Sequence, residues 1–173
     1  MATLKNFTGK IAVQDALSQE QKASFRNSYR VVQLPEGFVL WRFISKWGDK
    51  QFGAFWMDDE TMYEIMQSFQ NSGVFSATHK DYVIRESLAV IKKWSAVSVR
   101  VKVILLKEVV CYVGEVGTQK DYVEVENENL IGGGKITKFL EKRIGTQEQY
   151  VIPRFRDLPN YNAWAKVAHV VNV

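Results

Sequence analysis

The spacing of hydrophobic and polar positions along this chain predicts several strands. Between residues 97 and 105, valine and leucine alternate with serine, arginine and lysine, which is the two-residue period of a half-buried strand. Residues 29–32 and 38–44 are also typical of strands, and Pro35 and Gly37 between them predict a turn. Shorter apolar runs predict three more strands, at residues 109–116, 122–125 and 149–152.

Two segments between these strands are expected to be helical. The first helix should begin after Asp58 or Asp59, where acidic residues suit the positive end of a helix dipole, and run to about Phe69. The second should span Lys80 to Trp94. Residues 161–170 fit a helix or a strand equally well. Strands followed by helices and then by strands again predict the α+β class.

The polar N-terminus is interpreted as separate from the rest of the chain. Residues 15–25 permit a helix, so residues 1–28 are expected to form a helical lead-in. Residues 29–173 are expected to form a single domain, because 173 residues are about one domain's worth of protein.

Arg42 is the first candidate functional residue. It lies in the apolar run 38–44, and a two-residue period makes both faces of that strand apolar. A guanidinium in such a strand needs an anionic partner. Three interpretations are open: a carboxylate from elsewhere in the chain, a side chain that extends past the end of the strand into solvent, or the phosphate or carboxylate of a ligand, held bidentately.

Two glycine-containing segments are further candidates. Gly53 lies beside Phe55 and Trp56, where a close backbone approach and flat aromatic surfaces suit a ligand, although such clusters are more often core. The run 132–134 is three glycines without the spacing of a phosphate-binding loop, and it is interpreted as a hinge or mobile flap. Farther along, Glu148 and Gln149 open a strand that ends at Pro153.

The order of these segments resembles the ADP-ribosyltransferase-like superfamily. The matching residues are Tyr29-Arg30-Val31-Val32, Leu40-Trp41-Arg42, Phe52-Gly53-Ala54-Phe55-Trp56, Val113 to Gln119, and Gly132-Gly133-Gly134 with Gln149-Tyr150-Val151-Ile152-Pro153. The last pair is similar to the signature of necrotizing-toxin-type NAD glycohydrolases in the toxin branch. The resemblance implies a split, mostly antiparallel β-sheet core with flanking helices, and NAD as the substrate.

The resemblance also assigns roles to individual residues. Arg42 would hold the NAD diphosphate, Phe55 or Trp56 would stack on the nicotinamide near Gly53, and Gln149 would hold the ribose. The insert 135–146 leaves Glu148 as the competing catalytic choice. Cleavage of the nicotinamide–ribose bond builds positive charge on the sugar, and a glutamine accepts a hydroxyl hydrogen bond but is no general base.

Hydrolysis is therefore favoured over transfer of ADP-ribose to a protein acceptor. A further hypothesis is an NAD-consuming domain of the arginine–glutamate–serine type, for which the chain offers Arg42, Glu86 and Ser87. Glu86 and Ser87 are adjacent, however, and adjacent helical residues point about 100° apart. The alternative of another class is a binding or inhibitor module without catalysis. For a toxin, the resemblance implies a cognate inhibitor, or immunity, protein as partner.

Composition narrows the class of protein without adding a site. With 46% hydrophobic and 24% charged residues, the chain is not disordered. No apolar run reaches the ~18 residues of a membrane span, and the N-terminal residues lack the apolar stretch of a secretory signal, which leaves export as an effector open. The net charge of +4 falls well short of arguing for nucleic acid. Cys111 is the one cysteine, so no internal disulfide or metal site is expected, and action in the cytoplasm is favoured.

Overall fold

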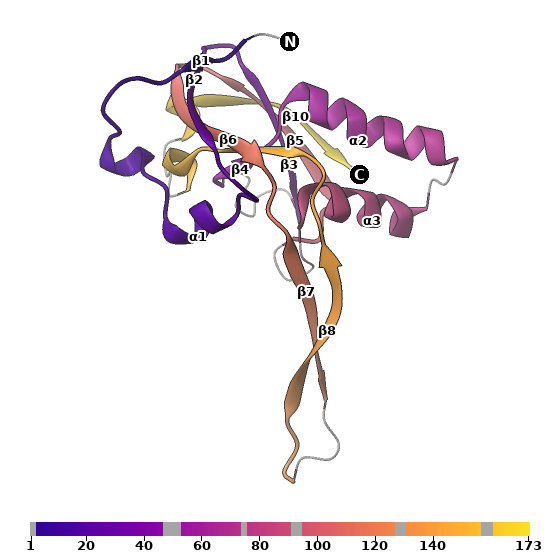
Figure 1. The fold of residues 1–173 in the computed structure, drawn as a ribbon. Coiled ribbons are helices and arrows are strands. Elements are labelled where there is room, and N and C mark those ends of the chain that lie inside the picture. The colour runs from indigo at the N-terminus through magenta and orange to yellow at the C-terminus, as the bar shows by residue number, and fades with distance from the viewer. Residues whose placement is uncertain (1–2, 47–52, 74–75, 91–94, 127–130, 157–160) are drawn as a thin grey trace.

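Two antiparallel sheets, two long helices and a projecting hairpin make up the fold (Figure 1). The computed structural model describes residues 3–46, 53–73, 76–90, 95–126, 131–156 and 161–173. The predicted α+β class with mostly antiparallel sheets is confirmed.

The larger sheet has five strands in the order β1-β2-β6-β9-β4. They are β1 (Lys5–Asn6), β2 (Arg30–Leu34), β6 (Val109–Glu115), β9 (Glu148–Val151) and β4 (Phe55–Trp56). The smaller sheet has three strands in the order β10-β5-β3. They are β10 (Ala165–Asn172), β5 (Val99–Leu105) and β3 (Val39–Ile44).

Within the described residues, a backbone bridge links the edges of the two sheets next to β4. Trp41 and Met57 form an isolated antiparallel bridge there, and each backbone N–H donates to the other's carbonyl oxygen at 2.8 and 2.9 Å. The strands part on either side of this bridge, so the core sheet is split. Side chains from both strands line the opening.

The helices form where the sequence predicts them, with shifted ends. Helix α2 (Asp59–Ser72) begins at Asp58, whose side chain accepts from the Thr61 N–H, and ends at Gly73 with a φ of 65°. Helix α3 (Ala77–Leu88) begins three residues earlier than expected, because Ser76 caps it. It ends at Ala89 with a φ of 49°, and Trp94 lies outside the described residues.

Two apolar clusters occupy opposite faces of β3. Leu40 and Ile44 pack into the core between the sheets, with the alternating buried residues Val99, Val101, Val103 and Leu105 of β5. Phe43 packs on the other side against α2 and α3, which lie side by side in Figure 1. The expectation that both faces of this strand are apolar is therefore confirmed.

The first 28 residues are integrated with the sheets. Besides the five-residue helix α1 (Gln19–Ala23), they contribute β1, which pairs with β2, and Phe25, which bridges to Val116. Asp15 is buried beside the strands, where its carbonyl oxygen accepts from the Tyr112 hydroxyl at 2.8 Å. The lead-in thus holds one short α-helix and also supplies part of the core.

A two-stranded hairpin projects from the body (Figure 1). It consists of β7 (Gln119–Glu126) and β8 (Lys135–Arg143), with Gln119 opposite Arg143 at the body and Glu126 opposite Lys135 at the far end. Gly132-Gly133-Gly134, expected to form a hinge or mobile flap, lie at the far end of the hairpin just before β8, and Gly132 and Gly133 have positive φ. The undecided segment 161–170 is a 3₁₀ turn followed by β10.

Candidate functional site

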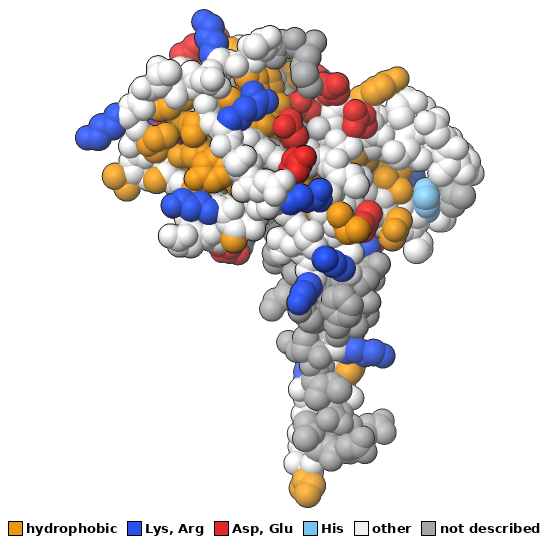
Figure 2. All heavy atoms as spheres, in the orientation of Figure 1, with side chains coloured by type: hydrophobic (Ala, Val, Ile, Leu, Met, Phe, Trp, Pro, Cys, Tyr) orange, Lys and Arg blue, Asp and Glu red, His pale blue; other side chains and the backbone are white. Residues whose placement is uncertain are grey.

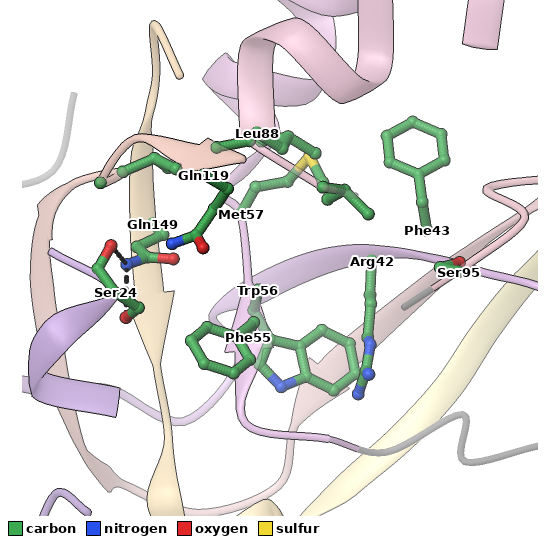
Figure 3. A pocket seen from close by; sticks show the side chains of 14 residues that line it. Ser24, Arg42, Phe43, Phe55, Trp56, Met57, Leu88, Ser95, Gln119 and Gln149 are labelled. Atoms are coloured by element: carbon green, nitrogen blue, oxygen red, sulfur yellow. Dashed lines mark hydrogen bonds between the residues drawn. The ribbon is translucent and has the colours of Figure 1, made fainter. Parts of the chain in front are cut away.

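A pocket of about 280 Å³ opens where β3 and β4 part. Its walls come from both sheets, from the C-terminal end of α3 and from the base of β7 (Figure 3). The pocket brings together Arg42, Phe55, Trp56 and Gln149, which the sequence singled out from three separate segments. Its wall is mainly apolar, and among the described residues that line it Arg42 carries the sole charge.

Arg42 is a half-buried cation that forms no ion pair with a carboxylate of the described residues. Its side chain points from β3 past the Trp56 indole, with the guanidinium carbon 5.9 Å from the ring centroid. Nη1 is buried and has no hydrogen-bond partner in the part of the chain that the structure describes. Burial lowers the pKa of Arg42 to about 10, so the group remains charged at neutral pH. An unpaired buried donor of this kind is costly.

Gly53 lies against the guanidinium. A Cβ atom at this position would overlap Nη1 and Cζ of Arg42, so the close approach requires a glycine. The Gly53 carbonyl oxygen accepts from the Trp56 indole N–H at 2.7 Å. The glycine therefore makes room for Arg42 and helps to orient Trp56.

The two aromatic residues of β4 have different environments. Trp56 is 3% exposed and packs edge-on against Phe155 in the core, while its ring also borders the pocket. Phe55 is 40% exposed and presents its ring to the pocket (Figure 3). Of the two, Phe55 offers the free aromatic face on which a flat ligand ring would stack.

Gln149 lies at the opposite end of the pocket from Arg42 (Figure 3). It is 7% exposed, and its amide nitrogen donates to both the carbonyl oxygen and the hydroxyl oxygen of Ser24, each at 2.9 Å. The amide oxygen points away from Ser24 and into the pocket. Gln149 therefore offers a hydrogen-bond acceptor to a ligand.

Glu148 lies outside this pocket. Adjacent residues of a strand point to opposite faces, and the exposed Glu148 lines a second groove with Asp58, Asp59 and Tyr150. Burial and the neighbouring Asp58 raise the pKa of Tyr150, whose hydroxyl donates to Asp58 at 2.9 Å. Figure 2 shows a row of acidic side chains on the body near the start of α2.

Several residues that line the pocket were not predicted from the sequence to belong to a functional site. Ser24 comes from the end of α1, and Leu88, Ala89 and Val90 come from the end of α3. Gln119 was quoted only as part of a strand and turn, yet its side chain lies beside Gln149 in Figure 3.

The alternative set of Arg42, Glu86 and Ser87 does not assemble in the pocket. Glu86 is 4.0 Å from Arg143 at the base of the hairpin. The carbonyl oxygens of Glu86 and Ser87 accept from the loop that follows β8. Neither Glu86 nor Ser87 is among the residues that line the pocket.

The residues with described positions contain neither a cluster of metal ligands nor a helix that could span a membrane. No group of three or more His, Cys, Asp or Glu side chains is placed to hold a metal ion. No helix within those residues is both long and apolar enough to cross a membrane. Cys111 is buried in the core, where desolvation raises the pKa of its thiol.

Comparisons with known proteins give one likeness. No protein-family model and no curated protein matches this chain. A chain of the solved structure described as "Rhs1-CT in complex with cognate immunity protein RhsI1" has a similar fold, with a TM-score of 0.50 and 15% sequence identity. The match covers 86% of this chain and 84% of that chain, and at this identity it shows the fold alone.

Proposed function

We propose that this chain is a bacterial toxin domain that hydrolyses the nicotinamide–ribose bond of NAD in the cytoplasm of a target cell. The observation that carries the proposal is the pocket itself. At one end lies Arg42, whose buried Nη1 has no acceptor among the described residues; an exposed aromatic ring lies in the middle, and an oriented hydrogen-bond acceptor lies at the other end. A diphosphate, a nicotinamide ring and a ribose hydroxyl are chemically complementary to these three features in that order.

The size of the pocket favours one half of the dinucleotide. Ligand pockets of drug-sized molecules measure about 300–1,000 Å³, and this one of about 280 Å³ lies at the lower limit. We assign the nicotinamide, its ribose and the adjoining phosphate to the pocket, with the adenosine half outside it. Only the part next to the bond that breaks then needs to be enclosed.

The polar groups favour hydrolysis by positioning over activation of an acceptor. Gln149 would hold a ribose hydroxyl through its amide oxygen while positive charge builds on the sugar carbon. Arg42 would bind the phosphate attached to the same ribose, so that both the ribose hydroxyl and its phosphate are held in place. Water can then accept the ADP-ribose group without a separate binding surface for a protein acceptor.

The likeness to a chain of a toxin–immunity complex supports a toxin function with a cognate inhibitor protein as partner. The same likeness leaves a second candidate, a non-enzymatic inhibitor module. The observation that favours this second candidate is the absence of Asp, Glu and His among the described residues that line the pocket. Such a module would bind its partner without consuming NAD.

Nicotinamide release separates these candidates. The purified chain is incubated with NAD, and nicotinamide and ADP-ribose are measured by chromatography. We expect turnover, and we expect Gln149→Ala to reduce it about 10- to 100-fold, or about 1.4–2.7 kcal/mol, without loss of folding. No release above the buffer control would favour the inhibitor module, and label from NAD on lysate proteins would favour transfer.

A further inference from the structure

The orientation of the Gln149 amide is determined by Ser24, a residue 125 positions earlier in the chain. The Gln149 nitrogen carries two hydrogens, and the two Ser24 oxygens accept one each at 2.9 Å. Both donors are therefore used on the side of the pocket wall. The oxygen is left for the pocket (Figure 3).

The bonding of Ser24 itself explains why the amide does not turn around. The Ser24 hydroxyl donates to the Gln21 carbonyl oxygen at 2.6 Å, which leaves its own oxygen as an acceptor. The Ser24 carbonyl oxygen also accepts from the Gly117 N–H at 2.6 Å. With the amide reversed, the Gln149 oxygen would face two acceptors at short distance, which is unfavourable in a buried position.

We propose that Ser24 is a positioning residue that makes Gln149 present an acceptor, and that it selects glutamine over glutamate at this position. A carboxylate there would place a negative oxygen against the two Ser24 oxygens and lose both donated hydrogen bonds. As a consequence, the ligand must bring a hydrogen-bond donor, such as a sugar hydroxyl, to this end of the pocket and an anion to the Arg42 end. The catalytic part of this inference rests on the proposed function.

The kinetic test uses three variants of the full chain. Ser24→Ala removes one of the two acceptors and should lower kcat for NAD hydrolysis about 3- to 10-fold with little change in KM, the size of one hydrogen bond. Ser24→Thr keeps both acceptors and should restore kcat. Ser28→Ala, at an exposed serine close by in the chain, is the matched control and should behave as the wild type.

The pH dependence of kcat in Gln149→Glu tests the orienting role of Ser24, because a purely structural role of Ser24 would not change it. Burial beside the Ser24 oxygens raises the pKa of the introduced carboxyl, since its charged form is disfavoured. When protonated, that group has one donor for Ser24 and one acceptor for the pocket, as the amide has. We expect kcat at least about 10-fold below wild type at pH 8 and recovery as the pH falls below about 6.

A matched control shows that the effect belongs to this position. Gln70→Glu makes the same change on α2, where the amide oxygen accepts from Gln67 and a carboxylate keeps that role. This variant should retain wild-type kcat and the wild-type pH profile. A flat profile for Gln149→Glu, or wild-type kcat at pH 8, would overturn the proposed selection of glutamine.

A measurement without NAD tests the orientation independently of the proposed function. In protein labelled with nitrogen-15 at glutamine, the Gln149 side-chain amide is assigned by its absence in Gln149→Glu. Its protons should exchange slowly with water, and about 3- to 10-fold faster in Ser24→Ala. Equal exchange in wild type and Ser24→Ala overturns the inference. Lack of NAD turnover by the wild type overturns only the proposed function, because the exchange experiment still decides the role of Ser24.

Discussion

Arg154 and Arg42 are both largely shielded from solvent, but they differ in whether the described residues supply a hydrogen-bond acceptor for the guanidinium. Arg154, in the 3₁₀ turn Pro153–Phe155, donates to both oxygens of Asp15 at 2.9 and 2.8 Å and stacks 4.5 Å over the Trp164 ring. Arg42 has an aromatic neighbour too, but its buried Nη1 has no acceptor within the described residues. The Arg154 guanidinium is paired within the fold, whereas Nη1 of Arg42 has no hydrogen-bond partner among the residues that the structure describes.

The contrast gives a physical criterion for separating structural from functional arginines. The Asp15 pair joins the N-terminal segment to the end of β9 and thereby contributes to the fold. Arg42 is desolvated, and its Nη1 gains no hydrogen bond from the described residues in compensation, which costs stability. Removing the first pair should therefore damage the fold, whereas changing Arg42 should affect ligand binding.

The largest expected effect is loss of the structural pair. Asp15→Ala leaves Arg154 without its carboxylate and should lower the free energy of unfolding by about 3–5 kcal/mol, measured by urea denaturation. Glu20→Ala, at an exposed acid on α1, is the control and should change it by less than about 0.5 kcal/mol. Similar losses in both variants would contradict the structural role of the pair.

The two aromatic residues beside Arg42 should also differ, one contributing to stability and the other to ligand binding. Trp56→Ala opens a cavity in the core and should cost about 3–5 kcal/mol of unfolding free energy. Phe55→Ala removes an exposed ring and should instead weaken binding of carba-NAD, a non-hydrolysable analogue, by about 3- to 10-fold. If Phe55→Ala leaves this affinity unchanged, the ring does not stack on the ligand.

Substitution of Arg42 should weaken ligand binding and leave stability intact, the opposite of what is expected for Asp15→Ala. Arg42→Lys keeps the charge but loses the fork-shaped donors, and Arg42→Met loses both. We expect carba-NAD affinity, measured by calorimetry, to fall about 10- to 100-fold in Arg42→Met and less in Arg42→Lys. The melting temperature should stay the same or rise, since an uncompensated buried charge is removed. A large fall in melting temperature with intact affinity would assign Arg42 to the structure.

High pH offers a test of Arg42 without mutation. Because burial lowers the pKa of Arg42 to about 10, the folded protein loses this positive charge as the pH rises through about 10. Stability at this site should increase as the pH rises through 10, because the unfavourable buried charge disappears. Anion binding should decrease, by about 10-fold between pH 9 and pH 11.

The same titration in Arg42→Met provides the control for this pH effect. Its affinity for carba-NAD should not change over this interval, provided that circular dichroism shows a folded protein. A parallel decrease in wild type and Arg42→Met would place the titrating group elsewhere.

The smallest expected effect concerns the glycine that accommodates Arg42. Gly53→Ala places a methyl group where the guanidinium lies, so Arg42 must move. We expect carba-NAD affinity to fall by several-fold, roughly 3- to 10-fold, and no further loss when Gly53→Ala is added to Arg42→Met. Additive losses would mean that Gly53 acts independently of Arg42.

Local sequence patterns were sufficient for much of the secondary structure. The alternation in 97–105 and the acidic cap before Thr61 depend on neighbours in the chain, and both predictions agree with β5 and α2. The end of α3 was misjudged, because the left-handed conformation of Ala89 has no signature in an alanine. The glycines 132–134 did not predict the hairpin, because a turn between two strands and a hinge use the same residue type.

By itself, the sequence determined that Arg42 lies in an apolar strand without a local acid, and that Glu148 and Gln149 face opposite ways. Only the tertiary structure decided which of the two faces the pocket. That outcome depends on the strand order β1-β2-β6-β9-β4 and on Ser24, whose contact with Gln149 spans 125 residues. Contacts between such distant residues arise from how whole sheets pack, and no local period of hydrophobic and polar positions encodes them.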